Sequence, residues 1–106
     1  MEKRYIQIET TFSNFKEAER LAGLIVDAGL AACGQLSEIN SVYNFEGKRF
    51  NEREILLTLK TRAELFLECE RFIKKHHPYK VPQIVATEIL AGSAEYLAWI
   101  DENLKK

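Results

Sequence analysis

The chain has 106 residues and a formal net charge of −1, with 46% hydrophobic and 29% charged residues. This length fits a single domain over residues 1–106. The balanced charge argues against nucleic acid or a membrane surface as a partner. No apolar run reaches the ~20 residues needed to cross a bilayer, and no secretory signal is recognisable. The two cysteines, Cys33 and Cys69, lie far apart in sequence, so we expect free thiols and a cytoplasmic location.

The first half of the chain predicts a strand, a helix and a long second strand. Residues 5–12 are rich in β-branched side chains and roughly alternate in polarity, which is typical of a half-buried strand. Asn14 and Glu17 have capping-box spacing, which predicts a helix start, and Gly29 is a natural helix end. Residues 31–45 are apolar and favour a strand.

The second half predicts a returning strand, a helix, a further strand and a short terminal helix. Residues 50–60 form the returning strand of a long hairpin. Thr61 and Glu64 have capping-box spacing, which predicts that a helix begins at this point. Residues 83–90 alternate apolar and polar side chains as a strand does, and Ser93 can cap the last helix.

This order, β-α-β-β-α-β followed by a helix, predicts an α+β fold of the ferredoxin-like type. Right-handed crossovers place two helices on one face of an antiparallel sheet. The hairpin of residues 31–60 is long for so small a domain, and many of its apolar side chains would face solvent in a monomer. Exposed apolar surface of this size usually marks a partner, so the pattern favours a homo-oligomer.

A stiff connector that contains both histidines follows the second predicted helix. Pro78 and Pro82 fix φ and disfavour helical geometry in the preceding residues, so the helix should end near His76. Imidazole suits copper, nickel and zinc, and Pro78 frees His77 from the helix so that both rings can approach one metal. Alternatively, the helix dipole favours His76 at the helix end, and His77 is hydrogen-bonded in the connector.

Several separate blocks of the sequence have a distinctive order and spacing. They are Leu30-Ala31-Ala32-Cys33, Ser41-Val42-Tyr43, Leu59-Lys60-Thr61, His77-Pro78-Tyr79-Lys80-Val81-Pro82 and Tyr96-Leu97-Ala98-Trp99. Together they resemble the CutA divalent-cation tolerance family over almost the whole chain. The resemblance implies a ferredoxin-like subunit in a tight homotrimer, with hairpins that join neighbouring sheets. It also implies tolerance of copper and other divalent metals, an architecture similar to that of the PII signalling proteins, and no firm enzymatic activity.

The sequence departs from the usual family pattern at four places. Phe45 stands where Trp is common, Gln83 stands where Glu is usual, and residues 34–36 replace a Val-Asn pair. Thr10 stands where some members have a cysteine proposed to bind copper. The last difference removes one soft ligand from the copper site that the resemblance implies.

The candidate metal ligands are His76, His77 and Cys33, whose counterparts the resemblance links to metal. We expect weak binding of Cu(II) or another divalent metal and no organic cofactor. A buried thiol usually behaves as a small hydrophobe, which is the alternative for Cys33 and the preferred interpretation for Cys69.

The candidate ligand pocket consists of Tyr43, Lys60, Tyr79 and Trp99. A lysine flanked by aromatic side chains can hold a small anion. The alternative is a structural role at an interface, with Lys60 bound to carbonyl groups or paired with Glu88.

No nucleophile elbow, HExxH, CxxC, Walker or GxGxxG motif is present, so the sequence does not predict an enzyme. The main hypothesis is a homotrimeric protein that contributes to divalent-metal tolerance by binding. One alternative is a PII-like regulator that binds a small anion between subunits, and another is a purely structural trimer.

Overall fold

The computed structural model describes residues 3–105 of the chain. Its elements in chain order are β1 (Tyr5–Phe12), α1 (Phe15–Asp27), β2 (Cys33–Phe45), β3 (Lys48–Arg62), a 3-10 turn (Ala63–Leu65), α2 (Phe66–His76), β4 (Val85–Ile89) and α3 (Ala94–Glu102). This order confirms the predicted βαββαβ arrangement with a terminal helix. None of the helices in the described part of the chain has the length and apolar character needed to span a membrane.

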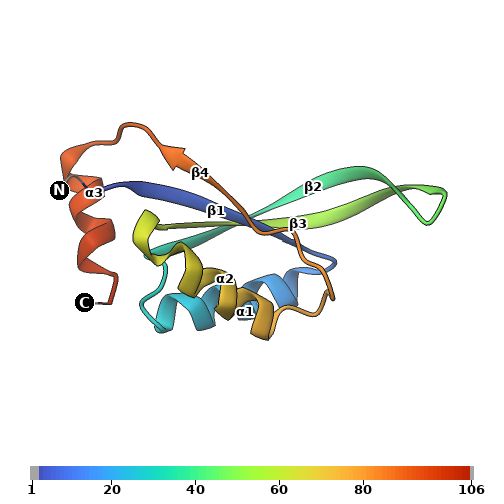
Figure 1. Ribbon diagram of the computed structural model, residues 1–106, viewed down its shortest axis with the longest axis horizontal. Helices are drawn as coiled ribbons and strands as arrows, with labels where there is room; N and C mark the ends of the chain where they lie inside the picture. Colours follow the sequence, from blue (N-terminus) through green and yellow to red (C-terminus); the bar gives the residue numbers. More distant parts are fainter. Residues whose placement is uncertain (1–2, 106) are drawn as a thin grey trace.

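The strands form one antiparallel sheet with the order β2-β3-β1-β4, which confirms the ferredoxin-like α+β fold. Helices α1 and α2 lie along one face, and α3 lies across one end of the sheet (Figure 1). We call the face opposite α1 and α2 the open face. Because strand side chains alternate between faces, this face carries the odd-numbered residues of β1 and β2 and the even-numbered residues of β3.

The hydrophobic core lies between the sheet and its two helices. Ile8 from β1, Leu57 from β3 and Ile25 from α1 are fully buried there. Gly34 lets α1 approach the sheet closely, because a Cβ atom at this position would lie 3.2 Å from the Cβ of Ala22.

A hairpin arm, formed by residues 39–54, extends beyond the body of the domain (Figure 1). β1 pairs with β3 only as far as Ile55, so these β2 and β3 residues pair only with each other. The domain is consequently 47 Å long but only 25 and 21 Å across. Val42 and Phe45 in the arm are 61% and 58% exposed, as expected for apolar side chains without a second layer.

The predicted ends of α1 and the start of α3 are confirmed. The Asn14 side chain accepts a hydrogen bond from the backbone N–H of Glu17 at 2.9 Å, and Gly29 has a φ of 73° just beyond α1. The Ser93 hydroxyl accepts one from the backbone N–H of Tyr96 at 3.3 Å. Asn14, Gly29 and Ser93 therefore start or end their helices as the sequence predicts.

The predicted helix start at Thr61 is wrong. Thr61 is still part of β3, and its hydroxyl donates a 2.7 Å hydrogen bond to the carbonyl oxygen of Leu30. The Cys69 thiol donates to the same oxygen at 3.3 Å, and burial raises the pKa of this thiol to about 12. A 3-10 turn, Ala63–Leu65, then precedes α2. The Thr61 hydroxyl thus joins β3 to the loop after α1 and does not cap a helix.

The last strand is shorter than predicted. β4 covers Val85–Ile89 instead of residues 83–90, because β1 offers it partners only between Tyr5 and Glu9. Residues 83 and 84 therefore remain part of the connector between α2 and β4.

Candidate functional site

Two separate clefts lie on the open face of the sheet. The larger, about 680 Å³, is the tyrosine cleft, whose lining includes Thr11, Tyr43, Glu52, Glu54, Tyr79 and Lys80. The smaller, about 280 Å³, is the lysine cleft, whose lining includes Gln7, Lys60, Ile89, Gly92, Tyr96 and Leu97. Gln7 and Thr11 are four residues apart on β1, so the clefts lie about 13 Å apart along the strand. Within one chain, the four predicted pocket residues are therefore divided between two places.

Two phenols face two carboxylates in the tyrosine cleft. The Tyr43 hydroxyl donates to Oε1 of Glu52 at 2.5 Å, and the Tyr79 hydroxyl donates to Oε2 of Glu54 at 3.1 Å. The hydrogen bond to Glu52 raises the pKa of Tyr43 to about 12. Burial and the bond to Glu54 raise the pKa of Tyr79. Both phenols thus keep their protons near neutral pH and hold the carboxylates in place.

The two carboxylates were not among the residues predicted from the sequence. Glu52 and Glu54 are two positions apart on β3, so they lie on the same face of the strand. Tyr43 stands opposite Phe50, which makes it a diagonal neighbour of Glu52. The signal in the sequence was the alternation of Glu52 and Glu54 within a predicted strand, which places both carboxylates on one face.

His77 is buried beside the tyrosine cleft, and both of its ring nitrogens have partners. Nε2 lies 2.8 Å from the carbonyl oxygen of Thr11, and Nδ1 accepts the backbone N–H of Tyr79 at 3.0 Å. Since a carbonyl can only accept, the proton of the neutral ring lies on Nε2. Burial lowers the pKa of His77, which favours this neutral form. His77 thus fixes the connector and the position of Tyr79, and neither nitrogen is free to bind a metal.

The three predicted metal ligands are not brought together within one chain. His76 is half-buried at the end of α2, with its ring 4.5 Å from that of Phe72. The Cys33 sulfur is 3.7 Å from the Tyr96 hydroxyl, beside the lysine cleft and far from His77. Among residues 3–105, no group of three or more His, Cys, Asp or Glu side chains is arranged to hold a metal ion.

Lys60 lies beneath an aromatic pair in the lysine cleft. Its ammonium nitrogen is 5.4 Å from the centroid of the Tyr96 ring, which stacks on Trp99 with centroids 5.7 Å apart. The alternative in which Lys60 pairs with Glu88 is wrong, because the Glu88 carboxylate instead forms an ion pair with Arg4 at 2.9 Å. Within the described residues Lys60 forms no ion pair, so its charge is available to a ligand.

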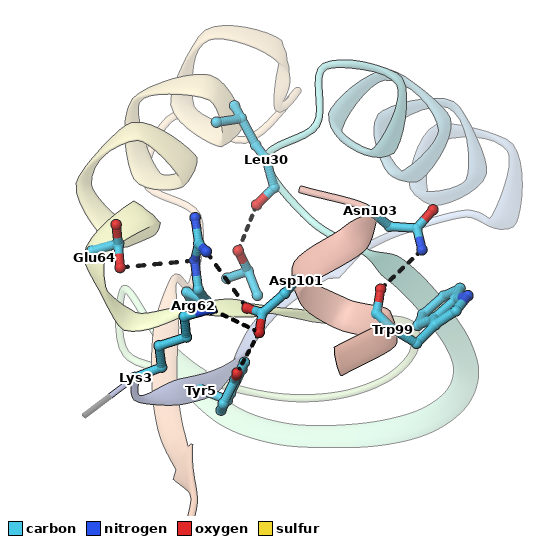
Figure 2. Close-up of polar contacts among 9 residues, drawn as sticks. Lys3, Tyr5, Leu30, Arg62, Glu64, Trp99, Asp101 and Asn103 are labelled. Carbon is cyan, nitrogen blue, oxygen red and sulfur yellow. Dashed lines mark hydrogen bonds and ion pairs between the residues drawn. The ribbon is translucent and has the colours of Figure 1, made fainter. Parts of the chain in front are cut away.

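Asp101 fixes α3 above this end of the sheet (Figure 2). It accepts hydrogen bonds from the Tyr5 hydroxyl at 2.8 Å and the Lys3 ammonium at 3.2 Å, and it lies 3.5 Å from Arg62. Burial acts to raise the pKa of Asp101, but these hydrogen bonds and positive charges outweigh it and lower the pKa. The network positions α3 so that Tyr96 covers Lys60.

Comparisons with known proteins match nearly the whole chain to CutA proteins. A family model described as CutA1 divalent ion tolerance protein matches residues 6–103. The divalent-cation tolerance protein CutA of Pyrococcus horikoshii is 36% identical, and the match covers 95% of this chain and 99% of the relative. The crystal structure of CutA1 from Oryza sativa has a TM-score of 0.93 at 36% identity, covering 97% of this chain and 95% of that one. A structure of CutA from Archaeoglobus fulgidus, described as periplasmic, has a TM-score of 0.92 at 37% identity, covering 95% and 99%.

Proposed function

Because the chain belongs to the CutA1 divalent ion tolerance family, we propose that it is a homotrimeric protein that contributes to tolerance of divalent metals, copper among them. It acts by binding and not by catalysis. The observation that carries this proposal is the family match over residues 6–103, which includes every helix and strand of the domain except for Tyr5 at the start of β1. We also propose a cytoplasmic location, which the two free thiols of Cys33 and Cys69 favour.

The hairpin arm supports assembly into a trimer. β2 and β4 are the two edges of the sheet, and each presents unpaired backbone groups to a further strand. Val42 and Phe45 are exposed on the arm, and Val85 on β4 is 47% exposed. An arm that packs on the sheet of a neighbour would cover these side chains, and three copies would close the ring.

Light scattering coupled to size-exclusion chromatography tests the assembly. We expect a particle of about three times the 12.3 kDa mass of one chain at micromolar concentration. A particle with the mass of one chain would contradict the proposal. Replacement of both Val42 and Phe45 by Ser should weaken the assembly, whereas replacement of the exposed Leu67 on α2 by Ser should not.

Metal binding, in this proposal, takes place at the surface around His76 and is weak. The geometry of His77 removes it as a ligand in the resting fold, and Cys33 can join His76 only across a boundary between subunits. Isothermal titration of the assembled protein with Cu(II) and with Zn(II) tests this, with metal tolerance of producing cells measured in parallel. The proposal would be overturned if the protein bound neither metal and its production did not increase the metal tolerance of the cells.

A second candidate function is the binding of a small anion in the lysine cleft. It is favoured by one observation: Lys60 has no carboxylate partner in the described part of the chain, although it lines a half-open cleft beside the Tyr96 ring. Lys60→Met should abolish any stabilisation of the trimer by phosphate or dicarboxylates, and Lys75→Met, on the exposed surface of α2, should not. If both variants respond as the parent does, this candidate fails.

A further inference from the structure

A third cleft, of about 310 Å³, lies at the end of the domain that is remote from the hairpin arm (Figure 1). We call it the arginine cleft, and its lining consists of Lys3, Arg62, Asp101, Glu102 and Lys105. These residues come from the chain before β1, from the last position of β3, and from α3 and the residues after it. None of them belongs to the hairpin arm, to β2 or to β4, so the surfaces through which we propose the trimer assembles do not include this lining.

Arg62 is largely buried at this cleft and is short of hydrogen-bond acceptors. Its side chain is 17% exposed, and its one hydrogen bond within residues 3–105 runs from Nη1 to Oδ1 of Asp101, at 3.5 Å. Nε is buried without a hydrogen-bond partner, since the Glu64 carboxylate lies 3.7 Å away. A guanidinium carries five N–H groups, and it is costly to keep them from water without acceptors. A ligand that offers oxygen atoms to the Nη groups is therefore favoured.

Asp101 satisfies Arg62 only in part, because it serves other donors as well. Its Oδ2 accepts the Tyr5 hydroxyl at 2.8 Å and the Lys3 ammonium at 3.2 Å, which leaves only Oδ1 for Arg62 (Figure 2). One carboxylate is thus shared between two cations.

The two lysines of the lining can also donate to a ligand. Lys3 bonds Asp101, and Lys105 pairs with Glu68, which lies outside the lining. Each ammonium has three N–H groups, so both lysines keep donors in reserve. The lining therefore combines a guanidinium fork with two ammonium groups, against the carboxylates of Asp101 and Glu102.

We propose that the arginine cleft binds a phosphate group, with the Nη groups of Arg62 donating to two of its oxygens and the ammonium groups of Lys3 and Lys105 donating to the others. The planar fork of arginine matches two phosphate oxygens, and the lysines supply point charges to the remaining ones. Free phosphate and the phosphate group of a small ester share this chemistry. An amine would instead meet repulsion from three cations.

Isothermal titration of the assembled protein at low ionic strength tests the proposal, with inorganic phosphate, glycerol 3-phosphate and acetate as ligands. We expect one saturable site per chain for the phosphate compounds, with an affinity about tenfold or more above that of the singly charged acetate. Tighter binding of glycerol 3-phosphate would identify an ester as the preferred source of the group, and tighter binding of phosphate would identify the free ion. Phosphate compounds that bind no better than acetate would overturn the proposal.

The Lys60→Met variant separates this site from the lysine cleft. Lys60 does not line the arginine cleft, so phosphate binding at Arg62 should persist in this variant. Loss of all phosphate binding in Lys60→Met would place the ligand in the lysine cleft and contradict the proposal.

Two substitutions with opposite effects locate the phosphate group. Arg62→Lys keeps the charge but removes the fork, so the affinity should fall about tenfold while the mass of the assembly is unchanged. Glu102→Gln removes a negative charge from the lining and should raise the affinity about twofold, a gain that unfolding cannot produce. The matched control is Glu95→Gln, an exposed acid of α3 outside the lining, which should bind as the parent does. Unchanged affinity in both Arg62→Lys and Glu102→Gln would refute the assignment.

Discussion

The imidazole ring of His77 lies flat against the phenyl ring of Phe12, with centroids 4.2 Å apart and planes inclined by 15°. In this position its two nitrogens bond the Thr11 carbonyl and the Tyr79 backbone N–H. The second bond requires an unprotonated Nδ1. Protonation of the ring therefore breaks the bond to the Tyr79 backbone N–H inside the connector, whereas the Nε2–H bond to the Thr11 carbonyl at the end of β1 is retained.

Stability should consequently fall in mild acid. Because burial lowers the pKa of folded His77, the unfolded chain takes up the proton first, at its ordinary value of about 6.5. The contribution of His77 is complete above that pH and declines as the pH falls through it towards the folded pKa. Urea unfolding between about pH 7.5 and about pH 5 measures this. His77→Gln should flatten the dependence, and His76→Gln should leave it in place.

Two fully buried threonines should respond oppositely to loss of their hydroxyl groups. Thr61 donates to the Leu30 carbonyl, whereas the Thr10 hydroxyl has no hydrogen-bond partner in the described part of the chain. Thr61→Val should lower the free energy of unfolding by about 1–2 kcal/mol. Thr10→Val should leave it unchanged or raise it, since an unsatisfied polar group is replaced by a methyl group. Urea titration at one protein concentration compares them, and equal losses would refute the assignment.

Two glycines provide a similar test of packing. A Cβ at Gly34 would lie 3.2 Å from side-chain atoms of Ala22 and Leu57, whereas nothing lies within 4 Å of a Cβ at Gly23. Gly34→Ala should therefore cost about 1–3 kcal/mol of stability. Gly23→Ala, on the exposed side of α1, should gain about 0.5–1 kcal/mol. Thermal unfolding that ranks the variants in the opposite order would contradict the close approach of α1 to the sheet.

Cu(II) binding should depend on His76 more than on His77. Both nitrogens of His77 are occupied in the fold, whereas His76 is half-buried at the end of a helix. His76→Ala should therefore remove most of the Cu(II) affinity, and Cys33→Ser should have a smaller effect because Cu(II) favours imidazole nitrogen. Titrations of these variants and of His77→Gln decide the matter. The greatest loss in His77→Gln would mean that the connector rearranges to bind metal.

The elements were predictable from sequence where local chemistry decides them. Asn14, Gly29 and Ser93 satisfy backbone groups of their own helices, and such contacts need no information from elsewhere in the chain. Thr61 has the same local signature, but pairing with Ile6 and the distant carbonyl of Leu30 keep it in the sheet. The mistaken helix start thus reflects a tertiary contact that overrides a local preference.

The candidate sites were less predictable because they depend on register. The aromatic and charged residues Tyr43, Lys60 and Tyr79 were identified from their chemistry, but their division between two clefts follows from the pairing of β1, β2 and β3. Pairing partners are set by the whole sheet and not by neighbouring residues in sequence. The commitment of both His77 nitrogens likewise depends on Thr11, at the end of a remote strand.

Trp99 is the only tryptophan of the chain, and it stacks on Tyr96 at the lysine cleft, remote from the tyrosine cleft. Intrinsic tryptophan fluorescence is therefore a built-in reporter for one end of the molecule. A ligand at Lys60 should shift or quench this emission, whereas a ligand in the tyrosine cleft should leave it unchanged. Emission and heat of binding recorded on one sample therefore show which end of the molecule a ligand occupies.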